Sequence, residues 1–311
     1  MRLKAGEPRW VYVIFLIGLF TYSARLILDS GFANSALIYV AIPFLISLAI
    51  FQLTRPPQDG RLIAAYLGHL RIATIIMLAT SAILFEGFIC VLFFMPIYFL
   101  IITLDFFIRL WAQQRKAKRD AKFQAAVWPL LIMILSVEGL SPSTSFERAN
   151  SITRSVIVDA NVDKLKTNMS KPIELPQSRH WFLSIFPLPV DVKAGTLDAG
   201  DVHTMDFVYK RWFFTNVKRG EFHLKIDSVS DSKVTTSVIK NTSYLSTYLE
   251  VKGTEVNFKP LGTDQTEVAL TIHYERRLDP AWYFAPMQEF AIGQSADYLI
   301  QSVIVREKAD E

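Results

Sequence analysis

The sequence predicts an α+β protein with two parts: a transmembrane helical domain of about five spans, then a curved antiparallel sheet wrapped around a long C-terminal helix. Residues 1–140 contain long apolar runs separated by short polar segments. The residues after 150 alternate apolar and polar side chains, as β-strands do. The last segment, Leu278–Ile304, is broadly apolar yet too polar to enter lipid. The predicted domains are therefore residues 1–140, a linker over 141–150, and residues 151–311.

The charge balance differs between these parts. Residues 1–140 carry 13 Lys and Arg against 7 Asp and Glu, a balance of +6, whereas residues 141–311 carry 20 against 22, a balance of −2. A basic excess confined to the membrane part is typical of a topology signal. The second part has no basic stripe and no nucleic-acid-binding module, so we expect no nucleic-acid partner. The single cysteine, Cys90, excludes an intrachain disulfide and a cysteine zinc site.

Four apolar runs supply the five candidate spans. They are Trp10–Leu28, Ser35–Leu53, the long run Leu62–Leu110, and Phe123–Leu140. The long run can cross twice, with a hairpin at Glu86-Gly87. Alternatively it crosses once, over Ile72–Met95, and continues as an interfacial segment after Pro96.

Basic residues in the short loops predict the orientation. The segment Arg109–Lys122 holds six of them and is predicted to be cytoplasmic. The amino terminus, with Arg2, Lys4 and Arg9, has the same sign. With five spans in a bacterial inner membrane, everything after residue 140 lies on the extracytoplasmic side. If residues 123–140 only lie on the membrane surface, the second domain stays inside.

Four ionisable residues fall within the apolar runs: His69, Arg71, Glu86 and Asp105. Such groups often mark a transport pathway. In a purely structural interpretation, these residues have no part in transport. Glu86 then lies in a turn, Asp105 lies near the membrane–water interface, and the Arg71 side chain extends to the polar surface of the membrane. Because no internal repeat or pair of broken helices supports transport, we prefer the structural interpretation.

The second part begins with a predicted strand, Ser151–Ala160. Asn161 is a predicted N-cap of a short helix, with Asp163 in its first turn. Further strand-like runs follow without a long helix between them, at residues 181–192, 203–217, 220–230, 233–241, 245–253, 254–262 and 267–278. The connections "KRG", "SDSK" and "TDQT" are predicted hairpin turns. The sheet is therefore expected to be antiparallel and meandering.

The closing segment is expected to cover the apolar face of this sheet. Asp279 is a candidate N-cap with Pro280 at the first helical position, and Pro286 restarts or bends the helix. Beyond it, a broad apolar surface is formed by Phe290, Ile292, Ala296, Tyr298, Leu299 and Val303.

Two stretches, "RSVIVDANVDKL" and "YERRLDPAWYFAPMQEFAIGQSADYLI", carry a family resemblance over roughly residues 151–304. With the order strand, short helix, several strands and long helix, this region resembles the helix-grip superfamily of START lipid-transfer domains, polyketide cyclases/dehydrases and pollen-allergen-like proteins. Members usually open with a strand, then Ala-Pro and an acidic residue at the start of a short helix that carries Val-Trp. Ala160, Asp163 and Leu165 fit this pattern, whereas Asn161 replaces the Pro and Lys166 the Trp.

The resemblance implies a hydrophobic cavity between the concave face of the sheet and the last helix. Such a cavity needs large apolar side chains at alternate strand positions. The predicted ligand-binding residues are Met205, Phe207, Tyr209, Arg211, Phe213, Leu270, Ile272, Tyr274, Arg276, Phe290 and Tyr298. Arg211 and Arg276 are candidates for meeting an anionic or carbonyl head group. Alternatively, both arginines lie at strand ends in solvent.

The sequence shows no motif for metal or covalent chemistry. None of the five histidines forms a His-x-His or Glu-x-x-His arrangement, and no serine or cysteine nucleophile motif is present. We therefore expect no metal, no cofactor and no assigned catalytic residue. Acid–base catalysis could still use Asp191, His203, Asp206 or Tyr209 if folding brings them together.

The expected function is membrane-tethered binding or transfer of a lipid or isoprenoid-like molecule, with the bilayer and that molecule as partners. A cyclase/dehydrase-type enzyme is the first alternative, and polar groups clustered deep in the cavity would favour it. A membrane assembly module is the second, and a pocket filled by side chains would favour that one.

Overall fold

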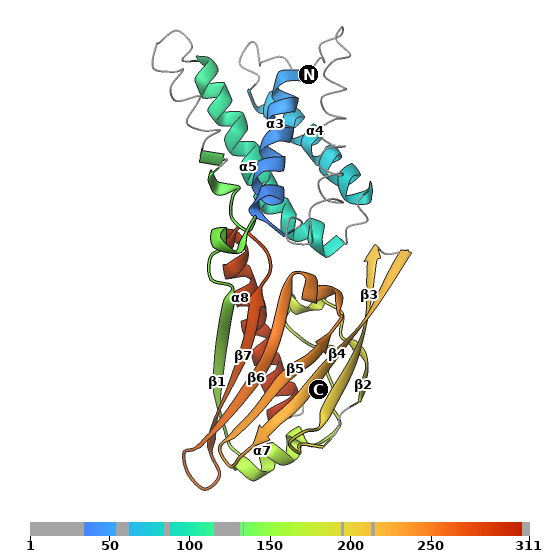
Figure 1. Ribbon diagram of the computed structural model, residues 1–311, viewed down its shortest axis with the longest axis vertical. Coiled ribbons are helices and arrows are strands. Elements are labelled where there is room, and N and C mark those ends of the chain that lie inside the picture. The colour runs from blue at the N-terminus through green and yellow to red at the C-terminus, as the bar shows by residue number, and fades with distance from the viewer. Residues whose placement is uncertain are drawn as a thin grey trace. The chain divides into compact units, whose positions relative to one another are not determined.

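The computed structural model describes residues 34–53, 62–83, 88–114, 131–132, 134–193, 196–212 and 215–306. The chain divides into two compact units (Figure 1). The first comprises Met1–Phe146 together with Leu278–Tyr283, and the second comprises Glu147–Arg277 together with Phe284–Glu311.

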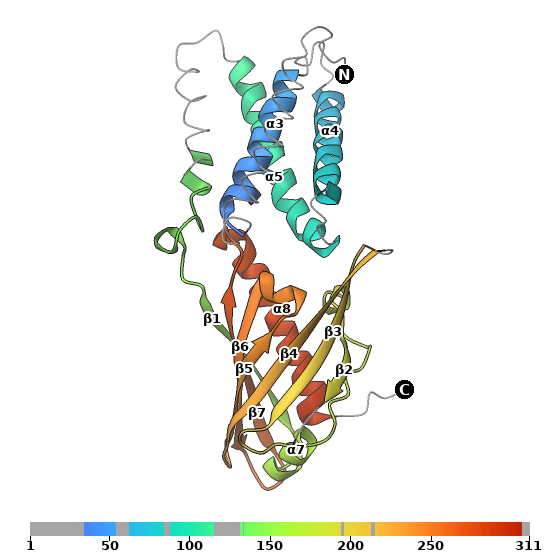
Figure 2. The same ribbon diagram turned by 45° about the vertical axis from the view of Figure 1, so that its right-hand side comes forward.

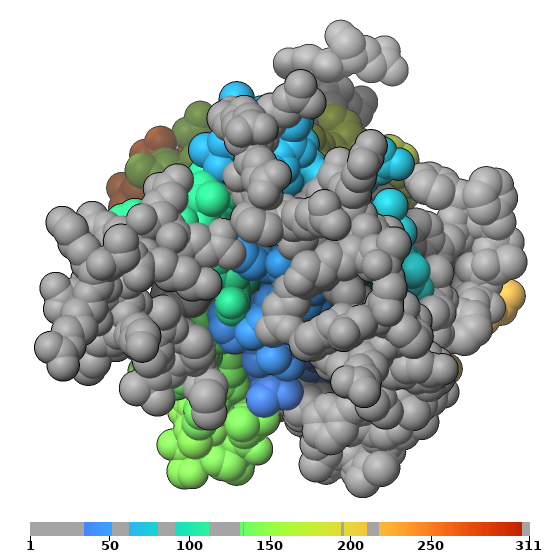
Figure 3. Space-filling model, turned by 90° about the horizontal axis from the view of Figure 1, so that it is seen from above, coloured from blue at the N-terminus to red at the C-terminus, as the bar shows by residue number. Residues whose placement is uncertain are grey.

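The first unit is helical. A π-helical turn, Leu37–Ala41, leads into α3 (Ile42–Leu53), and α4 (Leu62–Ile83) and α5 (Phe88–Gln114) follow. Helix α3 packs against both α4 and α5. Figure 2 shows α3 beside α4, and Figure 3 shows the described atoms of α3 in blue and of α4 in cyan. The core of this unit is formed by Val40, Phe44, Ile97, Ile101 and Ile132.

Two described helical stretches are long and apolar enough to cross a membrane, Leu62–Ala79 and Val91–Trp111. The predicted span Ser35–Leu53 is helical, but its apolar helix, Leu37–Phe51, is shorter. The predicted span Trp10–Leu28 and half of Phe123–Leu140 lie outside the described residues. The described part of the chain therefore has two candidate spans rather than five. The run Leu62–Leu110 contains two long helices, α4 and α5, rather than the single span of the alternative interpretation.

Two of the ionisable residues in these helices have polar partners inside the first unit. His69 is fully buried, and its Nε2 lies 2.9 Å from Ser47 Oγ. Asp105 is fully buried and accepts a hydrogen bond from Arg109 Nε, one helical turn later, at 2.8 Å. Asp105 is therefore paired inside the first unit, and its position near a membrane–water interface stays a prediction. Arg71 is exposed, its extension to the polar membrane surface stays a prediction, and Glu86 lies outside the described residues.

The segment Leu278–Tyr283 completes the first unit. The backbone N–H of Asp279 donates to Asn34 O at 2.8 Å, and that of Ala281 donates to Glu138 Oε1 at 2.8 Å. The Tyr283 hydroxyl donates to Phe93 O at 2.7 Å. The first residues of the last helix therefore bond to groups of the first unit.

The second unit is built on one seven-stranded antiparallel sheet with the order β1-β7-β6-β5-β4-β3-β2. The strands are β1 (Ala149–Val158), β2 (Pro189–Lys193), β3 (Val202–Trp212), β4 (Thr215–Val229), β5 (Lys233–Asn241), β6 (Leu249–Pro260) and β7 (Thr266–Arg276). From β2 to β7 the sheet is the predicted meander, and β1 pairs with β7. Helix α7 (Val162–Met169) follows β1, and α8 (Ala281–Leu299) continues as a π-helical segment, Ile300–Val305.

Some predicted boundaries are wrong in detail. The "KRG" residues lie inside β4 rather than in a turn, and β3 ends at Trp212. Residues 245–253 and 254–262 do not form two strands, because β6 runs from Leu249 to Pro260 through a register shift at Gly253. The run 181–192 contains a 3₁₀ turn, Leu183–Ile185, before the short β2.

The sheet curves around α8, as Figures 1 and 2 show. Burial alternates along the whole of β7, so every second residue faces the helix. The main core of the unit combines Val268, Leu270, Ile272 and Tyr274 of β7 with Ile292, Ala296, Ile300 and Ile304 from α8 and its continuation. The predicted α+β class, with a sheet gripping the last helix, is confirmed.

The start of α7 provides a stability prediction. The Asn161 side chain accepts a hydrogen bond from the Lys164 N–H at 2.9 Å, as expected of an N-cap. Replacing Asn161 by alanine should lower the free energy of unfolding by about 1 kcal/mol. Denaturant titration of the full chain in detergent measures this loss. Asn161→Asp keeps an acceptor oxygen and should stay close to wild type, and an equal loss in both variants would contradict the capping role.

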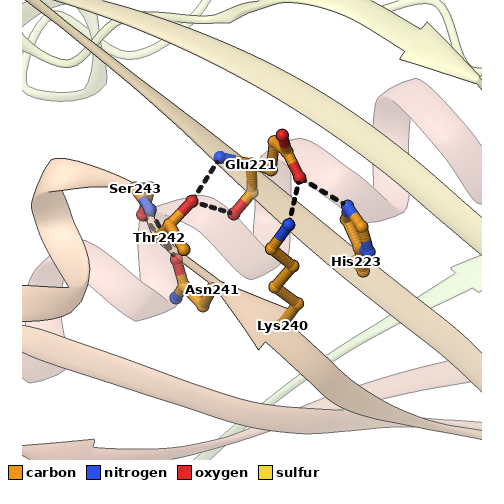
Figure 4. Close-up of polar contacts among 6 residues, drawn as sticks. All are labelled: Glu221, His223, Lys240, Asn241, Thr242 and Ser243. Carbon is orange, nitrogen blue, oxygen red and sulfur yellow. Dashed lines mark hydrogen bonds and ion pairs between the residues drawn. The ribbon is translucent and has the colours of Figure 1, made fainter.

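The outer face of the sheet carries ion pairs, one of which provides a pH prediction. The Glu221 carboxylate accepts from Lys240 Nζ at 2.6 Å and lies 3.2 Å from His223 Nε2 (Figure 4). The hydrogen bond from Lys240 and its charge lower the pKa of Glu221 below its usual value. A carboxylate whose pKa is lowered by folding stabilises the fold above its unfolded-state pKa, and this contribution is lost on acidification.

The melting temperature of the wild-type chain should therefore fall more between pH 7 and pH 3 than that of Glu221→Gln. Parallel thermal scans of the two proteins across this range measure the difference. Identical pH profiles would show that the pair contributes nothing to stability.

Candidate functional site

The second unit encloses a cavity of about 390 Å³. This volume is within the range of pockets that bind drug-sized molecules, about 300–1,000 Å³. Its walls come from β3 to β7, from α8 and its continuation, and from the segment that follows α7. The strand walls follow from side-chain alternation. In β3 the lining residues are His203, Met205, Phe207 and Tyr209, and in β4 they are Phe222, Leu224 and Ile226.

Five of the predicted ligand-binding residues line this cavity: Met205, Phe207, Tyr209, Leu270 and Ile272. Tyr274 and Arg276 share the face of β7 with the last two but do not line the cavity, and they are only 4% and 1% exposed. The alternative expectation that Arg276 lies in solvent is therefore wrong. The side chain of Arg211 and the whole of Phe213 lie outside the described residues.

The two predicted helix residues also lie away from the cavity wall. Phe290 is 43% exposed, and its ring packs edge-on against His180 and Phe182, with centroids 5.8 and 5.3 Å away. The Tyr298 hydroxyl donates to Pro176 O at 2.6 Å. The residues of α8 that do line the cavity are Ile292, Ser295 and Leu299. Tyr298 and Phe290 instead contact the segment between α7 and β2.

Several lining residues were missed by the sequence analysis. Phe222, Leu224 and Ile226 could have been assigned from the alternation in "GEFHLKI" once its two faces were compared. Ile173 and Leu175, from the segment after α7, carry no periodic signal. Asn241, Ser243 and Tyr244 were also missed, because they surround the end of β5 and the 3₁₀ turn Tyr244–Thr247.

Most polar groups of the cavity wall bond to the protein itself. His203 is 4% exposed, and its Nε2 lies 3.2 Å from Thr196 O, which can only accept. The Thr236 and Thr254 hydroxyls bond to each other at 2.7 Å, and Ser295 Oγ donates to Ala291 O at 2.9 Å. The wall is therefore apolar with few polar side chains, which is typical of a binding site for a hydrophobic molecule.

The acid–base candidates are not brought together in the cavity. His203 and Tyr209 both line the cavity but are separated by six residues along one strand, a distance of about 20 Å. Asp206 lies between Met205 and Phe207 in β3 and therefore points to the opposite face, as does its cross-strand partner Asp191. The described residues also contain no group of three or more His, Cys, Asp or Glu side chains placed to hold a metal ion.

No protein-family model matches the sequence, and no curated protein matches it. Among solved structures, the chain is similar to a START superfamily protein from Mycobacterium smegmatis, with a TM-score of 0.34, 15% identity, and coverage of 50% of this chain and 95% of that one. It is also similar to norcoclaurine synthase from Thalictrum flavum, with a TM-score of 0.33, 17% identity, and coverage of 53% of this chain and 91% of that one. At these TM-scores the likenesses carry no argument about function. The helix-grip architecture follows from the strand order and from the burial of α8 against the sheet.

Proposed function

We propose that the second unit binds a hydrophobic small molecule, lipid or isoprenoid-like, and that the first unit tethers it to a membrane. The observation that carries the proposal is the cavity of about 390 Å³, which is left open between the sheet and α8 and is lined mainly by apolar side chains. An assembly module with a filled pocket would not need such a cavity. The separation of His203 from Tyr209 favours binding over acid–base catalysis.

The apolar walls favour a hydrophobic ligand because burying apolar surface is the main driving force for taking such a molecule out of water. Tethering supports the same function. A ligand that leaves a bilayer has only a short aqueous path to a cavity held near the membrane, and attachment raises the local concentration of binding sites.

For the membrane part we propose a multi-pass arrangement in a bacterial inner membrane, with the amino terminus inside and the second unit outside. The two described helices of spanning length and the six basic residues of Arg109–Lys122 support this arrangement. Alkaline phosphatase fused to the carboxyl end should be active in bacterial cells. Green fluorescent protein fused at the same position should not fluoresce. The reverse pattern would place the second unit in the cytoplasm.

The binding function is tested by mass spectrometry of small molecules extracted from the full-length chain, purified in detergent. We expect about one hydrophobic molecule per chain to be retained, above the amount in an unrelated membrane protein purified in parallel. A chain that retains nothing, and that no member of a lipid and isoprenoid panel stabilises against heat, would overturn the proposal.

A further inference from the structure

The cavity wall contains no charged carboxylate, ammonium or guanidinium group among its described residues. Its titratable side chains are one histidine, His203, and two tyrosines, Tyr209 and Tyr244. An ionised ligand group placed among apolar side chains, without a partner of opposite charge, is strongly disfavoured. Arg276, predicted to meet an anionic head group, does not reach this wall. The described part of the wall therefore offers no partner of opposite charge to an ionised ligand group.

One polar side chain of the wall has an unused donor. Asn241 Oδ1 accepts two hydrogen bonds from Ser243, one from its backbone N–H at 3.1 Å and one from its hydroxyl at 2.7 Å (Figure 4). Since a backbone N–H can only donate, this contact fixes which amide atom is the oxygen. The Nδ2 amino group then has two protons, and no described residue accepts them. Asn241 and Ser243 both line the cavity.

Four other hydroxyl groups of the wall are already bonded within the protein. The protons of Ser243 and Ser295 are donated to protein oxygens, and Thr236 is paired with Thr254. A ligand that binds beside Asn241 therefore meets an N–H donor whose orientation is set by Ser243. The complementary ligand group is a hydrogen-bond acceptor.

We propose that the ligand is an uncharged apolar molecule carrying an acceptor oxygen, such as a ketone, ester or aldehyde, which accepts from Asn241 Nδ2. This inference rests on the proposed binding function, because it assumes that the cavity is the ligand site. It narrows the ligand class by excluding free fatty acids and phospholipid head groups from the cavity.

A competition experiment on the unmodified full-length chain tests this class directly. The chain in detergent is incubated at pH 8, where a carboxylate is ionised, with equal amounts of 2-tridecanone, tridecane and tridecanoate. After gel filtration the retained molecules are quantified by mass spectrometry. In Ser295→Trp the added indole ring is expected to fill the cavity. The amount retained by this variant is subtracted from the amount retained by the wild type, which corrects for small molecules that partition into the detergent micelle.

The ketone should be retained about fivefold more than the alkane and at least tenfold more than the carboxylate. Preferential retention of tridecanoate would overturn the neutral-ligand inference but leave the binding function standing. Equal retention of ketone and alkane would show that Asn241 does not donate a hydrogen bond to the ligand. If none of the three exceeds the Ser295→Trp background, the cavity is not the ligand site, and the binding function proposed for it fails.

A matched pair of variants tests the role of Asn241. Asn241→Asp keeps an oxygen for Ser243 but places a second acceptor where the donor was, so ketone retention should fall about tenfold. Asn257→Asp makes the same chemical change in β6, at a residue that does not line the cavity, and should leave retention unchanged. Equal retention by the two variants would contradict the inference. Melting temperatures measured in parallel show that both variants are folded.

Discussion

Replacing Gly253 by alanine is expected to destabilise the second unit by about 3 kcal/mol. Gly253 lies in β6, where the pairing with β7 shifts register. A Cβ atom at this position would lie 2.2 Å from the carbonyl oxygen of Thr236 and 3.2 Å from its carbonyl carbon. Both are backbone atoms of β5, so no side chain can rotate away, and the two strands must move apart within a closely packed interior. The cost combines lost strand pairing with disturbed packing against α8.

Thermal unfolding of the full chain measures this effect, and a loss of about 3 kcal/mol should lower the melting temperature by roughly 10 °C. Gly262→Ala is the matched control, because a Cβ added at Gly262, in the turn between β6 and β7, meets no atom within 4 Å. This control should unfold within about 2 °C of wild type. A Gly253→Ala chain that melts with the wild type would show that β5 and β6 are not held at the described separation.

Filling the cavity from α8 is expected to abolish ligand binding while leaving the fold intact. Ser295 lines the cavity, and its hydroxyl bonds only to Ala291 O of its own helix. In Ser295→Trp the indole ring would occupy space that the ligand needs, and retention of a hydrophobic molecule should fall at least a hundredfold. The fold should tolerate the change because the ring enters an existing cavity instead of a filled core.

The control for this variant is Glu289→Trp, which adds the same ring on the same helix at an exposed position that does not line the cavity. Both proteins are compared with wild type for retained small molecules and for melting temperature. Glu289→Trp should retain ligand as the wild type does. If Ser295→Trp also retains it at full stoichiometry, the ligand is held elsewhere and the cavity is not the site.

The sheet was predictable because burial on one face imposes a period of two on the sequence. The alternation of Val268, Leu270, Ile272 and Tyr274 was sufficient to identify the face of β7 that meets α8. The N-terminal cap of α7 was equally predictable from the sequence, because the acceptor, Asn161 Oδ1, and the donor, the Lys164 N–H, are only three residues apart. Local patterns therefore predicted local elements well.

Glycine was the main source of error. Gly220 was interpreted as part of a "KRG" turn, yet it lies inside β4, where an added Cβ would be 2.5 Å from Thr242 O. Because Gly220 has no side chain, the backbone that follows β5 can approach β4 closely. A single sequence does not distinguish a glycine of this kind from a glycine in a turn. The same limit applies to Asn241, whose exposure to the cavity depends on how β5 ends against the following 3₁₀ turn. Contacts between distant segments carry no periodic signal.

The division of α8 between the two units determines how the protein can be dissected. Its first residues, with Leu278 to Pro280, group with the helices of the first unit, and the Ala281 N–H and the Tyr283 hydroxyl donate to Glu138 and Phe93. The residues from Phe284 onward build the cavity wall. A fragment that begins at Glu147 would take these donors away from their acceptors and uncover apolar side chains at the start of its longest helix. One cut between residues 146 and 147 should therefore not release the second unit intact, and truncation or domain grafting should keep the two units together.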